Sequence, residues 1–121
     1  AIAAGALVLL AADTRLGAVG DFKYGLNETA IGMSLPPFGM EMAKCRLSKR
    51  HQTQAIIQAQ LYDPGAAQQV GYLDQVVAAD ALETQALEQA AALAELPGAA
   101  YAGTKLAVRR DYIDRIAASL A

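Results

Sequence analysis

The 121-residue chain has 55% hydrophobic and 18% charged residues, which suffices for one ordinary hydrophobic core but not for two. Twelve acidic and ten basic residues give a net charge of -2, so the overall charge does not attract a polyanion and nucleic-acid binding is disfavoured. The single cysteine, Cys45, has no disulfide partner and no Cys/His cluster beside it. We therefore expect no metal site, and a reducing, cytoplasmic setting fits best.

The first segment, residues 1–12, is apolar throughout. Asp13 and Arg15 end this run well short of the roughly 20 residues that a bilayer crossing needs, so we expect no membrane span here. The segment also lacks the basic region and the initiator methionine of a secretory signal peptide. We expect residue 1 to lie inside a larger folded unit.

Small residues near the start predict a tight turn that leads into a helix. Ala3, Ala4 and Gly5 come directly before the apolar run of residues 6–12. The first N–H groups of a helix lack partners within it, and the positive end of the helix dipole lies there, so this end favours a partial negative charge. Small side chains would let a ligand approach the backbone, although the same residues equally suit the start of a packed core helix.

The next residues predict two short strands, and a carboxylate follows the second. The first strand comprises residues 14–19 and ends in a turn at residues 20–21. In residues 22–26, aromatic and apolar side chains alternate with a period of two, which is typical of a half-buried strand. Glu28 follows at once, and functional groups commonly lie just past a strand end. On position alone, a solvated loop glutamate is the simpler interpretation.

Proline and polar residues divide the middle of the chain. Residues 36–37 are both proline and break the chain, and the apolar positions after them predict a short helix that buries Cys45. Ser48 is predicted to cap the next helix, which carries His51 as a surface residue without a chemical role. Its inward face should comprise Ala55, Ile56 and Ala59, and its outward face Lys49, Arg50 and Gln52.

A third helix has the clearest end signals in the chain. Asp63 is predicted to be its N-cap, Pro64 its first residue, and Gly71 its C-terminal end. Residues 72–77 then predict a short strand.

Two further helices are predicted for the remainder. Asp80 and Glu83 have the spacing of a capping box, which opens a helix that stops at residues 97–98. Residues 99–120 form the last, amphipathic helix, and we expect its apolar face to cover a neighbour. That face comprises Leu106, Ile113, Ile116 and Leu120.

In their order, these signals resemble the C-terminal half of the crotonase family, the enoyl-CoA hydratases and isomerases. The likeness is carried by residues 1–7, Asp13, residues 22–32, the break at Pro36 and Pro37, residues 63–71 and residues 73–77. It implies an α/β fold in which residues 1–77 belong to a spiral of strand-strand-helix units. Residues 78–121 would then be C-terminal helices that serve trimerisation and cover the active site.

The same resemblance implies the partners. The family binds acyl-CoA thioesters and forms trimers or hexamers, and this chain would work with the N-terminal half of the same protein. We expect no cofactor, because the substrate itself carries coenzyme A, and neither nucleic acid nor a membrane as partner.

The resemblance also assigns roles to individual residues. Ala4, with Gly5 beside it, would supply one of two backbone N–H groups that hold the thioester oxygen. Leu7 stands where the hydratases have a first glutamate, and Glu28 falls on the second catalytic glutamate. The run from Gly25 to Glu28, Gly-Leu-Asn-Glu, is that of the 3,2-enoyl-CoA isomerases. Substrate contacts are expected from Leu7, Leu26, Ile31, Pro36 and Lys105, the last near a CoA phosphate, although a solvated lysine is an equal alternative.

The chemistry of the reaction agrees with these roles. Removing a proton next to a thioester creates an enolate, which needs preorganised donors, each worth roughly 10²–10³ in rate. The reaction also needs a base within hydrogen-bond reach, and Glu28 among apolar neighbours suits that task. Three hypotheses remain: an isomerase with Glu28 as its one base, a hydratase whose second acid lies outside this chain, and an inactive family member that acts as a scaffold or binding protein.

Overall fold

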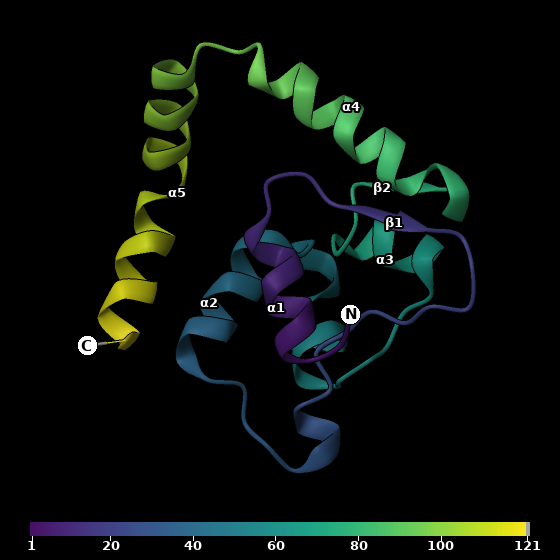
Figure 1. The fold of residues 1–121 in the computed structure, drawn as a ribbon. Helices are drawn as coiled ribbons and strands as arrows, with labels where there is room; N and C mark the ends of the chain where they lie inside the picture. Colours follow the sequence, from purple (N-terminus) through teal and green to yellow (C-terminus); the bar gives the residue numbers. More distant parts are fainter. Residues whose placement is uncertain (121) are drawn as a thin grey trace.

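The structure is a computed structural model that describes residues 1–120. It is mostly helical, with one small parallel sheet (Figure 1). Its helices and strands are α1 (Ala4–Ala11), β1 (Leu16–Ala18), α2 (Pro37–Arg46), α3 (Pro64–Val70), β2 (Gln75–Val77), α4 (Leu82–Ala94) and α5 (Gly98–Leu120). Four shorter helical turns are η1 (Thr29–Ile31), η2 (Lys49–His51), η3 (Thr53–Ile57) and η4 (Ala79–Ala81). No helix of the described chain is both long enough and apolar enough to cross a membrane.

Strands β1 and β2 confirm, in shortened form, two of the three predicted strands, those at residues 14–19 and 72–77. They pair in parallel, with Gly17 opposite Val76. A side chain at Gly17 would overlap Leu73 and the Tyr24 hydroxyl, so glycine permits this close packing. The chain between the strands forms α2 and α3, as a parallel connection requires.

The strand predicted for residues 22–26 does not form. Tyr24 makes an antiparallel bridge to Tyr62, and Gly25 makes a parallel bridge to Ile2, so two irregular segments flank this stretch. The expected alternation also fails, because Phe22 is exposed whereas residues 24–26 are all buried. Because this stretch is bridged to other segments on both sides, consecutive residues are buried. An alternating pattern of apolar and polar residues predicts only a strand with one face exposed to solvent.

Helix α2 begins after the two prolines as predicted, but small residues form its buried face. Gly39 and Ala43 are buried, whereas Cys45 is only half-buried. A side chain at Gly39 would press on Leu7 and Leu35, so the glycine lets α1 approach α2 closely. The expectation that Cys45 is a core residue is therefore wrong.

Two predicted helix caps are absent, and one is confirmed. The Ser48 side chain makes no capping bond, and the segment after it forms the turns η2 and η3 in place of one α-helix. The Asp80 box is also absent, since η4 intervenes and Ala81 precedes α4. By contrast, Asp63 accepts a hydrogen bond from Ala66 N at 2.8 Å. Gly71 ends α3 with a φ of 111°.

The segment after Ser48 keeps its predicted inward face but not its whole outward face. Ala55 and Ala59 are buried as predicted. The Gln52 side chain does not point only into solvent, because its Nε2 donates to Lys44 O at 3.0 Å and to Leu47 O at 3.3 Å. His51 is partly buried, and its Nδ1 is enclosed, so it is not a fully exposed surface residue.

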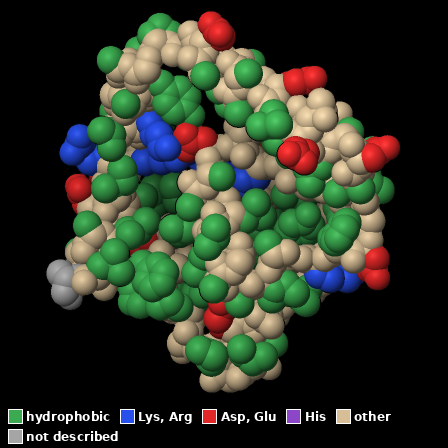
Figure 2. Space-filling view, in the orientation of Figure 1, with side chains coloured by type: hydrophobic (Ala, Val, Ile, Leu, Met, Phe, Trp, Pro, Cys, Tyr) green, Lys and Arg blue, Asp and Glu red, His purple; other side chains and the backbone are tan. Residues whose placement is uncertain are grey.

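The hydrophobic core lies in residues 1–77, which we call the body. Its largest fully buried side chains are Leu10, Leu26, Tyr72 and Leu73. Residues 78–120, which we call the arm, comprise α4 and α5, and neither helix has a buried side chain. In Figure 2 most of the visible Lys and Arg side chains gather beside α5, with another at the opposite side of the body, and several Asp and Glu side chains lie along α4.

The face that α5 turns towards α2 differs from the predicted one. Arg109, Tyr112, Ile116 and Ser119 are partly buried, and α5 packs mainly against α2. Of the four predicted residues only Ile116 belongs to this face, while Leu106, Ile113 and Leu120 are exposed. Most of the predicted apolar face of α5 therefore does not pack against α2.

Candidate functional site

The site begins where the N-terminal segment meets the loop that carries Glu28. Ala3 N donates to Gly25 O at 2.9 Å, and Gly25 N donates to Ala1 O at 3.1 Å. A side chain at Gly25 would lie 2.9 Å from Gln60 O and overlap Leu61, so only glycine fits this position. These contacts fix the start of α1 relative to Glu28, three residues after Gly25.

A residue in a strained conformation, Ala3, directly precedes α1. Ala3 has a φ of 56° and a ψ of -124°, a sparsely populated conformation for a residue with a side chain. Gly5 N donates to Ile2 O at 3.1 Å, so its N–H is occupied. Within residues 1–120, however, nothing accepts a hydrogen bond from Ala4 N, which is exposed at the positive end of the helix. The predicted donor is therefore open to a ligand, and a Cβ on Gly5 would meet only open space.

Glu28 is one of two buried charged residues among the described residues, and the two differ sharply. Arg15 is 4% exposed, and its guanidinium donates to the carbonyls of Tyr72, Ala12 and Gly71 at 2.9–3.0 Å. Glu28 is 8% exposed, yet its Oε2 is enclosed without a hydrogen-bond partner. Buried charges are normally paired, so an unpaired one indicates chemistry more than stability.

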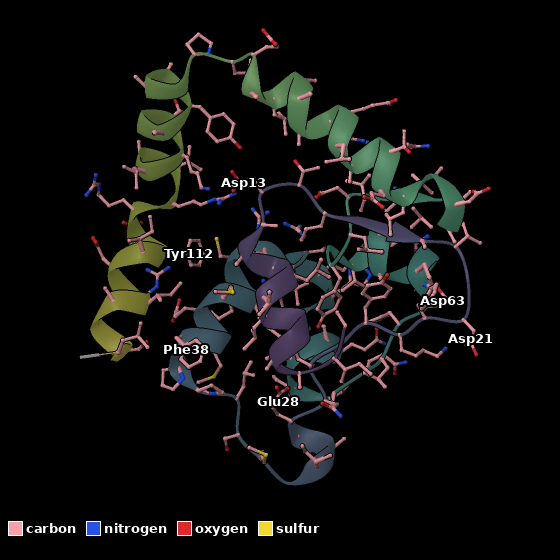
Figure 3. All side chains as sticks on the ribbon, viewed as in Figure 1. Asp13, Asp21, Glu28, Phe38, Asp63 and Tyr112 are labelled. Carbon is pink, nitrogen blue, oxygen red and sulfur yellow. The ribbon has the colours of Figure 1, made fainter. Side chains whose placement is uncertain are left out.

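The backbone around Glu28 explains how the side chain is held. Glu28 O accepts from Ile31 N at 3.1 Å and from Met33 N at 2.9 Å, which folds the chain into η1. Gly32 closes this turn with a φ of 78°, a conformation that favours glycine. Figure 3 shows Glu28 near the N-terminal end of α1, where Ala4 lies, and Asp13 beyond the other end.

The other predicted contact residues differ in how accessible they are. Leu7 is half-buried and packs against the core beside Gly39. Leu26 is fully buried within that core, so in this chain it offers no surface to a substrate. Ile31 is exposed one turn after Glu28, and Pro36 is the partly exposed N-cap of α2.

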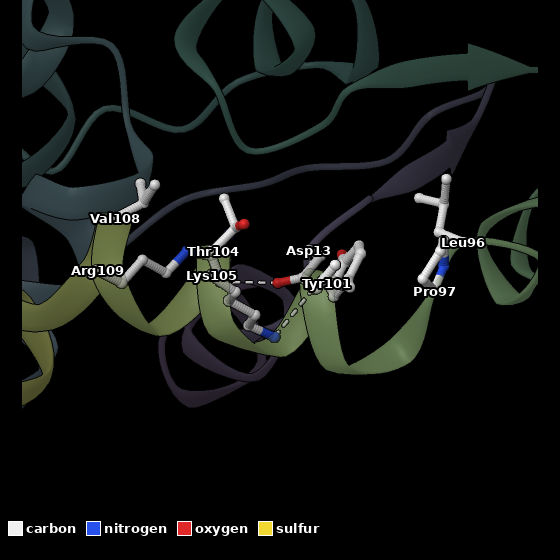
Figure 4. Close-up of a pocket in the computed structure, with 9 residues that line it drawn as sticks. Asp13, Leu96, Pro97, Tyr101, Thr104, Lys105, Val108 and Arg109 are labelled. Atoms are coloured by element: carbon white, nitrogen blue, oxygen red, sulfur yellow. Dashed lines mark hydrogen bonds and ion pairs between the residues drawn. The ribbon is translucent and has the colours of Figure 1, made fainter.

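Lys105 lies in a separate cluster that joins the arm to the body. Asp13 accepts hydrogen bonds from Tyr101 at 2.6 Å, Lys105 at 2.9 Å and Arg109 at 2.7 Å, all from α5 (Figure 4). Burial alone would raise the pKa of Asp13, but these three hydrogen bonds outweigh it and hold the pKa far below its usual value. We call these four residues the Asp13 cluster.

The Asp13 cluster borders a cavity of about 440 Å³, which apolar residues of the α4–α5 connection also line. Sequence reasoning missed the cluster, because its members lie 88 to 96 residues from Asp13 and no local pattern links them. Within residues 1–120 no group of three potential ligands is placed to hold a metal ion.

Comparison with known proteins places this arrangement in a family. The family described as Enoyl-CoA hydratase/isomerase matches residues 1–121. A human protein, mitochondrial enoyl-CoA delta isomerase 1, is 31% identical over 115 residues, which is 94% of this chain and 38% of the relative. The name of that relative places it in mitochondria, and the cytoplasmic setting expected for this chain stays a prediction.

Two solved structures show the same fold. An enoyl-CoA hydratase/isomerase family protein from Pseudomonas syringae is 41% identical with a TM-score of 0.95, covering 98% of this chain and 52% of the other. An enoyl-CoA isomerase from Mycobacterium tuberculosis is 34% identical with a TM-score of 0.94 and the same coverage. The chain thus spans about half the length of these structures, and the predicted α/β crotonase-type fold is confirmed. The chain belongs to the enoyl-CoA hydratase/isomerase family.

Proposed function

We propose that this chain carries the base of an acyl-CoA-processing enzyme that converts a 3-enoyl-CoA into a 2-enoyl-CoA. One observation carries the proposal: an enclosed, unpaired carboxylate, Glu28, and an open helix N–H group, that of Ala4, lie on two segments that hydrogen bonds tie together. Enolate chemistry needs this combination of a base and an oxyanion donor.

In the proposed reaction Glu28 removes one proton from C2 of the substrate. The electron pair of that C–H bond moves towards the thioester carbonyl, whose oxygen becomes negative and accepts a hydrogen bond from Ala4 N. The resulting dienolate takes the same proton back at C4, so the double bond moves from C3–C4 to C2–C3. No atom is gained or lost, and one carboxylate able to reach both carbons suffices.

Leu7 supports isomerisation over hydration. Hydration needs a water molecule activated on one face of the alkene, and a half-buried leucine in the turn after Ala4 and Gly5 cannot hold that water. The human relative carries the name isomerase, and the M. tuberculosis protein is named an isomerase in one solved structure and a probable enoyl-CoA hydratase in another. A hydratase would need a second acid from outside this chain, and an inactive scaffold would turn over no acyl-CoA at all.

The rest of the active site is proposed to come from the N-terminal half of the family fold and from neighbouring subunits in a trimer or hexamer. The second oxyanion donor and most of the CoA pocket would lie there. A contact between Lys105 and a CoA phosphate also stays a prediction, and Lys105 would have to share its charge with Asp13, to which it is already bonded.

The test replaces the proposed base in the intact protein. Glu28→Gln keeps the shape of the side chain and removes its basicity, so we expect turnover of a 3-enoyl-CoA to fall by roughly 10²–10⁴ with little change in substrate binding. Glu83→Gln, a change at an exposed position of α4, is the matched control and should retain full activity. Wild-type turnover by Glu28→Gln would refute the proposed function.

A further inference from the structure

Helix α1 connects the proposed oxyanion donor to a group of arginine contacts at its other end. Within residues 1–120 nothing accepts a hydrogen bond from Ala4 N at the N-terminal end, and the helix ends at Ala11 after eight residues. A helix of this length spans only about 12 Å and is not stable by itself in water. The direction of α1, and with it the position of Ala4 N, must therefore come from tertiary contacts.

Arg46 of α2 binds three carbonyl groups at the C-terminal end of α1. Its Nε donates to Leu10 O at 3.2 Å, and its Nη2 donates to Ala12 O at 2.9 Å and to Asp13 O at 3.0 Å. The last carbonyls of a helix lack partners within it, and a cation there complements the negative end of the helix dipole. Helix α1 has no basic residue in its own last turn, so Arg46 brings this cation from a neighbouring helix.

The apolar contacts between α1 and α2 involve small residues. The two helices pack side by side (Figure 1), with Ala6 of α1 and Ala43 of α2 fully buried, and Gly39 leaves room for Leu7. Apolar contacts are non-directional, whereas a hydrogen bond weakens steeply as its angle departs from linear. The three hydrogen bonds of Arg46 therefore add a directional constraint on α1 that the apolar packing lacks.

A second arginine holds the same end of α1 from another side. Arg15 Nη1 donates to Ala12 O at 2.9 Å, and the same guanidinium binds the carbonyls of Gly71 and Tyr72 after α3. Arg15 is buried and serves several parts of the core, so its replacement would disturb the whole body. Arg46 is only partly buried, and its side-chain hydrogen bonds all go to the end of α1, so its role can be tested separately.

The N-terminal end of α1 carries strain that these contacts help to maintain. The ψ of Ala3 sets the orientation of the peptide plane that carries Ala4 N–H, and it is -124° at a φ of 56°. A conformation of this kind is costly and persists only where the surrounding structure holds both sides. The hydrogen bond from Ala3 N to Gly25 O, at 2.9 Å, holds the side before it. The contacts of α1 hold the side after it.

We propose that Arg46 is a positioning residue for the oxyanion donor of the proposed active site. By binding the last carbonyls of α1, it holds the helix where Ala3 keeps its strained conformation and Ala4 N–H reaches the thioester oxygen. Without this anchor α1 shifts, Ala3 relaxes, and the hydrogen bond to the developing oxyanion lengthens. Arg46 lies at the opposite end of α1 from Ala4, so it acts through the helix and not by contact with substrate. This inference rests on the proposed function, because it concerns the donor that this function needs.

Replacement of Arg46 in the intact protein tests the inference. Arg46→Gln removes the forked donor, so we expect kcat for 3-enoyl-CoA isomerisation to fall roughly 10- to 100-fold with KM little changed, because a misplacement of about 1 Å weakens transition-state contacts to that extent. Arg50→Gln, a change at an exposed arginine of η2, is the matched control and should keep the wild-type kcat. A wild-type kcat for Arg46→Gln would overturn the inference.

Arg46→Lys is a milder variant that keeps the test decisive if Arg46→Gln does not fold. Lysine retains the positive charge at the end of α1 but lacks the planar fork that binds several carbonyls at once. We expect a thermal stability close to that of wild type and a kcat about tenfold lower. An unchanged kcat for folded Arg46→Lys would overturn the inference.

The stretching frequency of the thioester carbonyl separates positioning from stability. Infrared difference spectra of bound 3-enoyl-CoA, isotopically labelled at the thioester carbonyl carbon, can be recorded in the Glu28→Gln background, where turnover is slow. A hydrogen bond to the carbonyl oxygen lowers this frequency, so adding Arg46→Gln should raise it, and adding Arg50→Gln should not. An unchanged frequency with Arg46→Gln would overturn the inference. Wild-type turnover by Glu28→Gln alone would instead refute the proposed function.

Discussion

The body and the arm of this chain differ in how many side chains they bury. Among the described residues, the buried apolar side chains all belong to residues 1–77, although α1, α2 and α3 are short helices of 8, 10 and 7 residues. The arm has the longer helices, α4 and α5, of 13 and 23 residues, and neither has a buried side chain. In this chain, therefore, helix length and amphipathic pattern do not indicate where the core lies.

Polar contacts attach the arm to the body. The Asp13 cluster joins the C-terminal end of α1 to α5, and Arg115 Nε donates to Glu41 Oε2 of α2 at 2.8 Å. Ion pairs of this kind hold an orientation with modest energy, whereas burial supplies most of the stability of a fold. The proposed base, Glu28, thus lies in the well-packed apolar region, whereas ion pairs add to the packing of α5 on α2 where the arm meets the body.

The largest contrast should come from two equivalent truncations. Leu10 is 1% exposed in the body, and Leu106 is 51% exposed on α5. Leu10→Ala should lower the free energy of unfolding by about 2–5 kcal/mol, because it removes buried methyl groups and leaves a cavity. Leu106→Ala should change it by less than about 0.5 kcal/mol. Urea unfolding of the intact protein measures both, and equal losses would show that the intact assembly buries the arm as deeply as the body.

A smaller effect is expected where the two regions meet. Asp13→Asn removes the charge that Lys105 and Arg109 share, so α5 should lose about 1–2 kcal/mol of docking energy. Amide hydrogen exchange in residues 98–120 should become roughly 5–30 times faster, while exchange in residues 1–77 stays unchanged. Asp114→Asn, at an exposed position of α5, is the control. Uniformly faster exchange throughout the chain would contradict an anchor that is specific to the arm.

The smallest effect is the dependence of this docking on pH. The hydrogen bonds of the Asp13 cluster depress the pKa of Asp13 in the folded state, so its contribution is complete above its unfolded pKa of about 3.9 and declines as pH falls below that value. The stability difference between wild type and Asp13→Asn should therefore shrink between pH 6 and pH 3, as thermal unfolding can show. The difference between wild type and Leu10→Ala should persist, and a gap for Asp13→Asn that is constant with pH would rule out the charge as its cause.

Local signals in the sequence predicted α3 correctly, although the caps expected from Ser48 and Asp80 do not form. Asp63, Pro64 and Gly71 placed both ends of α3 correctly, because a cap, a first-turn proline and a left-handed glycine act within a few residues. The strand expected at residues 22–26 failed because its pairing depends on Ile2 and Tyr62, which are distant in sequence. Periodicity reports that a segment has an apolar face, but not which neighbour covers it.

The candidate site was predictable to a similar extent. The flanking glycines and the family resemblance indicated Glu28 and Ala4. In the structure Glu28 is buried, and the N–H group of Ala4 has no partner among the described residues. The Asp13 cluster has no signal in the linear sequence, because it arises from tertiary contacts between Asp13 and α5. The missing partner of Glu28 Oε2 is likewise visible only in the folded chain.

The proposed function requires that one carboxylate moves the double bond and that no second acid activates water. The most direct measurement supplies the intact protein with a 3-enoyl-CoA and, separately, with a 2-enoyl-CoA in water. We expect rapid formation of 2-enoyl-CoA from the first and little 3-hydroxyacyl-CoA from the second, because the apolar Leu7 side chain cannot hold and activate a water molecule. Rapid hydration of the 2-enoyl-CoA without migration in the 3-enoyl-CoA would contradict it and show that a second acid reaches the site from outside this chain.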